Sequence, residues 1–135
     1  MYDELIKNLK KFEGFKGNPY VDSRGYLTVG IGTKLPLDEE EAEFLLKHRL
    51  KKTVNELNVL KLNDLDIKEE AKIILYDMAY NLGVRGLLKF KKMWKALENK
   101  DYLEASKEMQ DSKWFKQVGR RSKELVSKME KLSEY

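Results

Sequence analysis

Apolar residues recur every three or four positions in six segments of the chain, a spacing that places them on one face of a helix. The predicted helices cover residues 3–13, 38–57, 66–83, 87–97, 101–109 and 120–132. In the first helix the apolar stripe consists of Leu5, Ile6, Leu9 and Phe12. In the second, we expect Ala42, Leu46, Leu50, Val54 and Leu57 to face inward. The pattern predicts a mainly α-helical protein.

Polar residues at the helix ends support these boundaries. Asp3 is a plausible N-cap of the first helix, and residues 38–41 and 66–69 both have the D-x-x-E form of a capping box. Asp101 is placed to cap a later helix in the same way. Gly83 follows the last apolar residue of the third helix, where glycine commonly ends a helix.

Between the first two helices, the pattern changes to that of a β-hairpin. Residues 15–21 and 26–32 have the composition of short strands, and the turn between them begins with Asp22 and ends with Gly25. Alternation places Leu27, Val29 and Ile31 on one face of the second strand and Tyr26, Thr28 and Gly30 on the other. The sequence therefore predicts an α+β fold with a small N-terminal β-hairpin lobe.

Composition narrows the classes of site that the chain can form. Its 135 residues are enough for one domain, and they include no cysteine and a single histidine, His48, in a charged helical run. Disulfides are excluded, and a zinc cluster is not expected. The net charge of +4 and the pI near 9.1 favour attraction to polyanions, such as nucleic acid, a membrane surface or an anionic cell wall.

The hairpin region contains the residues that indicate chemistry. Glu13 ends the first helix, Asp22 opens the turn, and Thr28 lies on the second strand. Cleavage of a glycosidic bond needs one carboxyl group to protonate the leaving oxygen and another to activate water. Each residue also has a simpler explanation, because Asp22 suits a turn, Glu13 a fraying helix end and Thr28 a strand. Their combined spacing favours the catalytic interpretation.

That spacing resembles a known family. Glu-Gly at a helix end, Asp nine positions later and the pattern Y-x-T-x-G-x-G resemble the phage-type lysozymes, glycoside hydrolase family 24. The resemblance implies that Glu13, Asp22 and Thr28 are the catalytic residues. The family commonly has histidine where this chain has Thr33, so we expect substrate contacts at Gly32 and Thr33 to differ more than the chemistry does.

Two later segments extend the resemblance. Residues 78–83, MAYNLG, are similar to the Y/F-N-x-G segment that lines the family's substrate cleft, which makes Tyr80 and Asn81 candidate sugar contacts. Core packing is an equally good interpretation of Tyr80. Residues 114–124 resemble the C-terminal region in which an arginine reaches towards the catalytic Glu. Arg121 matches that arginine best, and Arg120 is the adjacent alternative.

The resemblance implies one lysozyme-like domain over residues 1–135, with a hairpin lobe at about 14–34, a helical lobe at about 66–135 and helix 38–57 joining them. It also implies hydrolysis, with inversion, of the β-1,4 bond between N-acetylmuramic acid and N-acetylglucosamine in bacterial peptidoglycan. A monomer is expected, with no cofactor, metal or nucleic acid partner. The rival hypotheses are a basic helical module that binds wall polymer or nucleic acid without catalysis, and a lysozyme fold whose cleft serves recognition alone.

Location follows from weaker signals. No stretch approaches the roughly 20 apolar residues of a membrane span, so stable insertion in a membrane is not expected. The segment MYDELIKNLKK lacks the apolar region of a signal peptide. If the chain derives from a phage, we expect it in the host cytoplasm until its release to the wall; an engineered chain would have no natural location.

Overall fold

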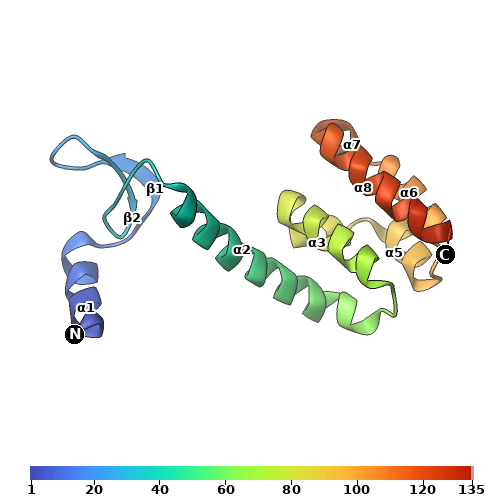
Figure 1. Ribbon diagram of the computed structural model, residues 1–135, viewed down its shortest axis with the longest axis horizontal. Coiled ribbons are helices and arrows are strands. Elements are labelled where there is room, and N and C mark those ends of the chain that lie inside the picture. The colour runs from blue at the N-terminus through green and yellow to red at the C-terminus, as the bar shows by residue number, and fades with distance from the viewer. Residues whose placement is uncertain (135) are drawn as a thin grey trace. The chain divides into compact units, whose positions relative to one another are not determined.

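The computed structural model describes residues 1–134 and confirms a mainly helical α+β chain with a small sheet near the N-terminus. The chain divides into two compact units, residues 1–46 and the residues from 47 onward. Figure 1 shows α1 and the strands in the first unit and α3 to α8 in the second. The long helix α2 (Glu39–Leu60) crosses the boundary in sequence.

The first unit contains α1 (Tyr2–Glu13) and a three-stranded antiparallel sheet. Strands β1 (Lys16–Val21) and β2 (Leu27–Gly30) form the predicted hairpin. A third strand, β3 (Thr33–Lys34), pairs with the other edge of β2 and was not predicted, because two residues are too few to show an alternation. Thr28 lies in the central strand, directly opposite Tyr20 on one side and Lys34 on the other.

Helix α1 ends where the sequence predicts, but it does not start with the predicted cap. Asp3 lies inside the helix, and Met1 occupies the N-cap position without a side-chain hydrogen bond. At the other end, Gly14 has φ of 67° and its N–H donates to the carbonyl of Lys10. No residue of α1 is buried, so the first unit leaves its apolar stripe uncovered.

Helix α2 begins with the predicted capping box. The N–H of Glu41 donates to Asp38 Oδ1 over 2.8 Å, and the N–H of Asp38 donates to Glu41 Oε1 over 3.0 Å. The predicted inward face was wrong for Ala42 and Leu46, which are exposed, and Leu57 is the one buried residue of this helix. The apolar side chains in the first half of α2, Phe44, Leu45 and Leu46, are all exposed.

After α2, the second unit continues with a short 3₁₀ turn, Leu62–Asp64, and α3 (Glu69–Leu82). The capping box predicted at residues 66–69 was wrong: Lys68 holds the N-cap position without a side-chain bond. Asp66 lies too far before the helix to reach its first N–H groups, and its Oδ2 instead accepts a 2.7 Å bond from Lys100 Nζ.

The helix predicted at residues 87–97 is two helices, α4 (Val84–Leu88) and α5 (Lys91–Glu98). In a continuous helix the carbonyl of Leu87 would accept from the N–H of Lys91. Here that carbonyl accepts from the N–H of Phe90 over 3.1 Å and from Trp94 Nε1 over 2.9 Å. The indole bond therefore takes part in the break, which apolar periodicity cannot reveal.

Three further helices complete the unit: α6 (Tyr102–Gln110), α7 (Lys113–Val118) and α8 (Arg120–Lys131), followed by a 3₁₀ turn at Leu132–Glu134. The predicted cap at Asp101 is confirmed, since its side chain accepts from the N–H of Glu104 over 3.0 Å. Gly119, with φ of 72°, separates α7 from α8.

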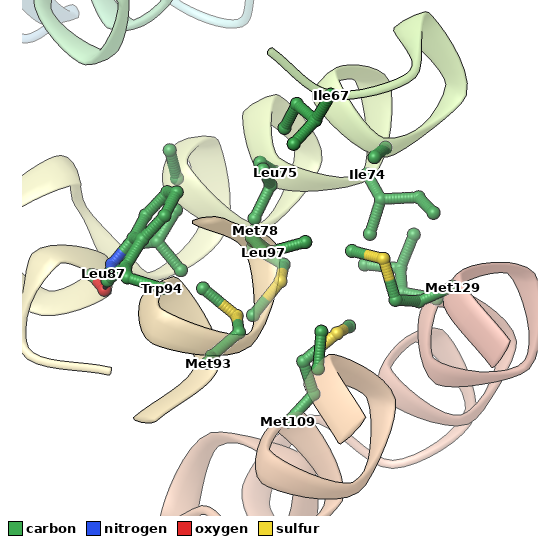
Figure 2. Close-up of a cluster of buried hydrophobic side chains, with 14 of the residues drawn as sticks. Ile67, Ile74, Leu75, Met78, Leu87, Met93, Trp94, Leu97, Met109 and Met129 are labelled. Carbon is green, nitrogen blue, oxygen red and sulfur yellow. Dashed lines mark hydrogen bonds between the residues drawn. The ribbon is translucent and has the colours of Figure 1, made fainter. Parts of the chain in front are cut away.

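The buried core of the described chain lies in the second unit and is rich in methionine. Figure 2 shows Met93, Met109 and Met129 in one cluster of buried side chains with Leu97. All four side chains have no exposed surface. Methionine is flexible and fills irregular gaps, so a core built from short helices can pack without matched ridges.

Candidate active site

Five of the predicted site residues belong to the first unit: Glu13, Asp22, Thr28, Gly32 and Thr33. Helix α1 carries the first at its last residue, and the sheet carries the others at or beside its strands. The sequence therefore brings the three predicted catalytic residues into one compact unit of 46 residues.

Asp22 is held by hydrogen bonds to both of its carboxylate oxygens. Oδ1 accepts from the N–H groups of Arg24, over 2.9 Å, and Tyr26, over 2.8 Å. Oδ2 accepts from Lys34 Nζ over 2.6 Å. The turn interpretation of Asp22 is thus correct for one oxygen. The contact with Lys34 was not predicted, because it joins β3 to the turn after β1, twelve positions apart in sequence.

These contacts stabilise the ionised form of Asp22. The hydrogen bond from Lys34 is the main reason that the pKa of Asp22 falls from 3.8 to about 2, and the N–H groups of Tyr26 and Arg24 lower it further. The side chain keeps 14% of its exposed area, so it remains within reach of a ligand. Asp22 is a carboxylate at any pH near neutrality.

Thr28 is the one fully buried residue of the first unit. Its hydroxyl donates to the carbonyl of Tyr26 over 2.9 Å, which leaves the lone pairs of Oγ1 as acceptors. Tyr20 and Lys34 lie opposite Thr28 in the sheet, so the three side chains project on the same face.

Glu13 lies against Gly32. A Cβ atom at Gly32 would be 2.6 Å from Cδ of Glu13 and 2.7 Å from its Oε2, so the carboxyl group occupies the space that any larger residue would need. Within residues 1–46, the carboxyl group of Glu13 has no hydrogen bond or ion pair. The two carboxyl groups therefore have opposite surroundings: Asp22 is fixed by three N–H donors, and Glu13 is fixed by none.

The remaining candidates belong to the second unit. Asn81 Oδ1 accepts a 3.1 Å hydrogen bond from Nε1 of Trp114, a buried residue of α7. Tyr80 is 38% exposed, which does not support the core-packing interpretation. Sequence spacing gave no sign of the contact between Asn81 and Trp114, because it joins α3 to α7 across 33 positions.

Arg121, at the start of α8, is bound to α3. Its Nε donates to Asp77 Oδ1 over 2.7 Å, and its Nη2 donates to the same oxygen and to the Asp77 carbonyl. Arg120 makes only a 3.5 Å ion pair with Glu124, and its side chain is 93% exposed. The two neighbours therefore differ in their contacts, while an approach of Arg121 to Glu13 stays a prediction.

Three further observations concern metal ions, membranes and pockets. Among residues 1–134, no three or more His, Asp or Glu side chains are grouped so as to hold a metal ion. No helix in the same range is both long and apolar enough to cross a membrane. An open pocket of about 830 Å³ in the second unit is lined by Asp66, Lys100 and Tyr102 among others, and by none of the predicted site residues.

Comparison with known proteins places these residues in a family. Residues 10–131, which include every predicted site residue, match the family described as Phage lysozyme. The chain belongs to the phage lysozyme family. It is accordingly a glycoside hydrolase that acts on peptidoglycan, and the two non-catalytic hypotheses are set aside.

Two relatives match this phage lysozyme over nearly their whole length. They are the probable T4-type lysozymes 1 and 2 of Dictyostelium discoideum, both 28% identical, over 158 and 163 aligned positions. The alignments cover 93% and 96% of this chain, and 93% and 95% of the relatives. Both alignments exceed the 135 residues of the chain, so the relatives contain segments that it lacks.

A third relative is larger. The pre-baseplate central spike protein Gp5 of Enterobacteria phage T4 is 30% identical over 151 positions, which cover 88% of this chain but 26% of the spike protein. The matching segment is thus one part of a longer protein in that case.

Proposed function

We propose that the enzyme hydrolyses the β-1,4 bond between N-acetylmuramic acid and N-acetylglucosamine with inversion at the anomeric carbon. Glu13 is the general acid, Asp22 the base or electrostatic partner, and Thr28 the residue that positions the attacking water. Family membership supports the substrate class, and the first unit supports the division of roles.

The assignment of Glu13 as acid and Asp22 as its ionised partner rests on the different surroundings of the two carboxyl groups. A general acid must hold a proton that it can give to the leaving oxygen, and its partner must be ionised. Asp22 is stabilised as the anion by three N–H donors, which makes it unsuited to donate a proton. Glu13 accepts no such hydrogen bond within its unit and lies against Gly32, and the proposal gives it the role of the acid.

The low pKa of Asp22 also limits what it does as a base. A carboxylate with a pKa of about 2 accepts a proton weakly. Asp22 therefore orients the water and stabilises positive charge on the sugar, and it takes the proton as the new bond forms. Thr28 Oγ1 has its own proton committed to the Tyr26 carbonyl, so towards that water it can act only as an acceptor.

Two variants and one product analysis test this proposal. Glu13→Gln and Asp22→Asn are each expected to lower peptidoglycan hydrolysis by roughly 10²- to 10⁴-fold with the fold intact. NMR of the fresh reducing end, recorded before mutarotation, should show the α configuration first. An initial β product would reject inversion, and full activity of Glu13→Gln would reject the acid assignment.

A further inference from the structure

Lys34 makes a contact at the proposed site that the reaction does not yet explain. Its ammonium group lies 2.6 Å from Oδ2 of Asp22. Lys34 is directly opposite Thr28 in the pairing of β3 with β2, so its side chain leaves the sheet on the Thr28 face. The side chain is 52% exposed, which means that core packing does not account for its position.

The hydrogen bonds of Asp22 leave little freedom for a water molecule. A carboxylate accepts about four hydrogen bonds, two at each oxygen. Oδ1 already accepts two, from the N–H groups of Arg24 and Tyr26. Oδ2 accepts one, from Lys34, and so has one acceptor position left. The direction of that position depends on where the ammonium group lies.

We propose that Lys34 is a positioning residue of the reaction: by binding Oδ2 of Asp22, it fixes the acceptor position at which the attacking water is held beside Thr28. This inference rests on the proposed function, in which Asp22 and Thr28 share that water. Lys34 acts through Asp22 and does not itself contact the reacting atoms.

Other charged and titratable groups lie around the ion pair of Lys34 with Asp22 and add to its stability. The bond to Asp22 is the main cause of a raised pKa for Lys34, and attraction to Glu13 and Tyr20 adds to it. The ammonium group also lies 6.0 Å from the centre of the Tyr26 ring, over which Arg24 is stacked at 5.6 Å.

The lowered pKa of Asp22 predicts how the stability of the fold and of the site depends on pH. Because Asp22 has a lower pKa in the folded protein, its ionised form stabilises the fold and the site. That contribution is complete above pH 3.8 and is lost as the pH falls towards 2. Without the ammonium group the pKa of Asp22 should rise towards 3.8, so its contribution to stability should shrink and the carboxylate in the site should become protonated at higher pH.

The test compares three variants of the full chain. Lys34→Met removes the ammonium group and keeps an unbranched side chain, and Lys34→Arg keeps a positive donor. Lys16→Met is the matched control, because Lys16 lies on the same sheet but its ammonium group is over the Tyr20 ring, at 4.3 Å, and binds no carboxylate. Activity is measured on a soluble peptidoglycan oligosaccharide, and the Asp22 carboxyl carbon is titrated by ¹³C NMR.

For Lys34→Met we expect kcat to fall roughly tenfold with KM nearly unchanged, since two N–H donors still hold Oδ1. The acid limb of the activity profile and the NMR titration of Asp22 should both move to higher pH. Lys34→Arg should recover most of kcat, and Lys16→Met should match the wild type.

The failures can be told apart. Equal kcat in Lys34→Met and Lys16→Met, with Asp22→Asn inactive, would reject the positioning role alone. An unchanged Asp22 titration in folded Lys34→Met would do the same, because it would show that the ammonium group does not hold the carboxylate. Full activity of Asp22→Asn would reject the proposed function and this inference with it.

Discussion

Gly32→Ala is expected to remove most of the activity by displacing the general acid. The new Cβ atom would lie 2.6 Å from Cδ, 2.7 Å from Oε2 and 2.9 Å from Cγ of Glu13. Carbon atoms in contact normally lie about 3.5–4.0 Å apart, so the carboxyl group must move by about 1 Å. The side chain of Glu13 is exposed and flexible, and it can move without unfolding the unit.

The size of the loss follows from that displacement. A misplacement of about 1 Å at a catalytic group can cost about 10²-fold in rate, or about 2.7 kcal/mol of transition-state stabilisation. The backbone adds a separate cost. Gly32 has φ of 68°, and an alanine held there loses about 1–2 kcal/mol of folding free energy. Activity and stability should therefore both fall, for different reasons.

Gly30→Ala separates the two effects. Gly30 has φ of 73°, so alanine there has the same backbone strain, but a Cβ atom would meet nothing within 4 Å. We expect the two variants to lose similar folding free energy in urea unfolding. Clearing of a peptidoglycan suspension should fall about 10²-fold for Gly32→Ala and stay near the wild-type rate for Gly30→Ala.

Two outcomes would refute the reasoning. A Gly32→Ala enzyme with near wild-type clearing would mean that the position of Glu13 beside Gly32 is not the catalytic one. Equal loss in both variants would mean that sheet strain, and not displacement of Glu13, reduces the activity.

Three further predictions concern the second unit and the whole surface. Asn81→Ala should cost about 1–3 kcal/mol of folding free energy, because it leaves the N–H of the buried Trp114 side chain without a hydrogen bond. Asn81→Asp keeps an oxygen acceptor for that N–H. If stable Asn81→Asp loses activity, the loss would indicate that the Asn81 amide contacts the sugar. Arg121→Ala should lower the rate of peptidoglycan clearing more than Arg120→Ala does. Loss of the ion pair with Asp77 should reduce the folding free energy of Arg121→Ala by no more than about 1 kcal/mol. Equal or reversed effects on clearing would mean that the helix register is one residue off. Raising salt should weaken binding to intact cell walls in pull-down assays, since the net charge is +4, and a salt-independent affinity would remove the electrostatic argument.

Local rules predicted the chain well where the interacting groups are close in sequence. The caps at Asp38 and Asp101 each bond an N–H three residues on, and both were predicted. The same pattern failed at Asp66 because the helix begins at Glu69, two residues later than the pattern implies. Lys100, 34 positions away, binds that carboxylate instead, and no local pattern reveals such a partner.

The break between α4 and α5 is another feature of the fold that local sequence patterns do not predict. Apolar residues continue at helical spacing through residues 87–97, so periodicity predicts one helix. A bond from the Trp94 indole to the Leu87 carbonyl competes with the backbone ladder at that point. Side-chain contacts with the backbone decide such breaks, and spacing alone does not contain them.

The predicted site also contains residues that local spacing reveals and residues that it does not. Glu13, Asp22 and Thr28 are found by short spacings from the end of α1 through the hairpin, and the structure keeps them in one unit. Lys34 was missed because its contact depends on β3, which pairs only two residues with β2. The contact of Gly32 with Glu13 was missed for a related reason: it arises where the end of α1 meets the segment after β2, a packing that the sequence does not specify.

The two interpretations of Asp22 turn out not to compete. Turn chemistry needs one acceptor for the N–H groups that follow, and Oδ1 supplies it. Catalysis needs a fixed, ionised oxygen that faces the sheet, and Oδ2 is directed there by Lys34. A turn that consumes one oxygen is itself a means of orienting the other, because a carboxylate held at Oδ1 cannot rotate freely. A residue that suits its local structure is therefore no weaker as a catalytic candidate, and the Asp22→Asn variant, which keeps the turn acceptor and loses the charge, is the substitution that separates the two roles.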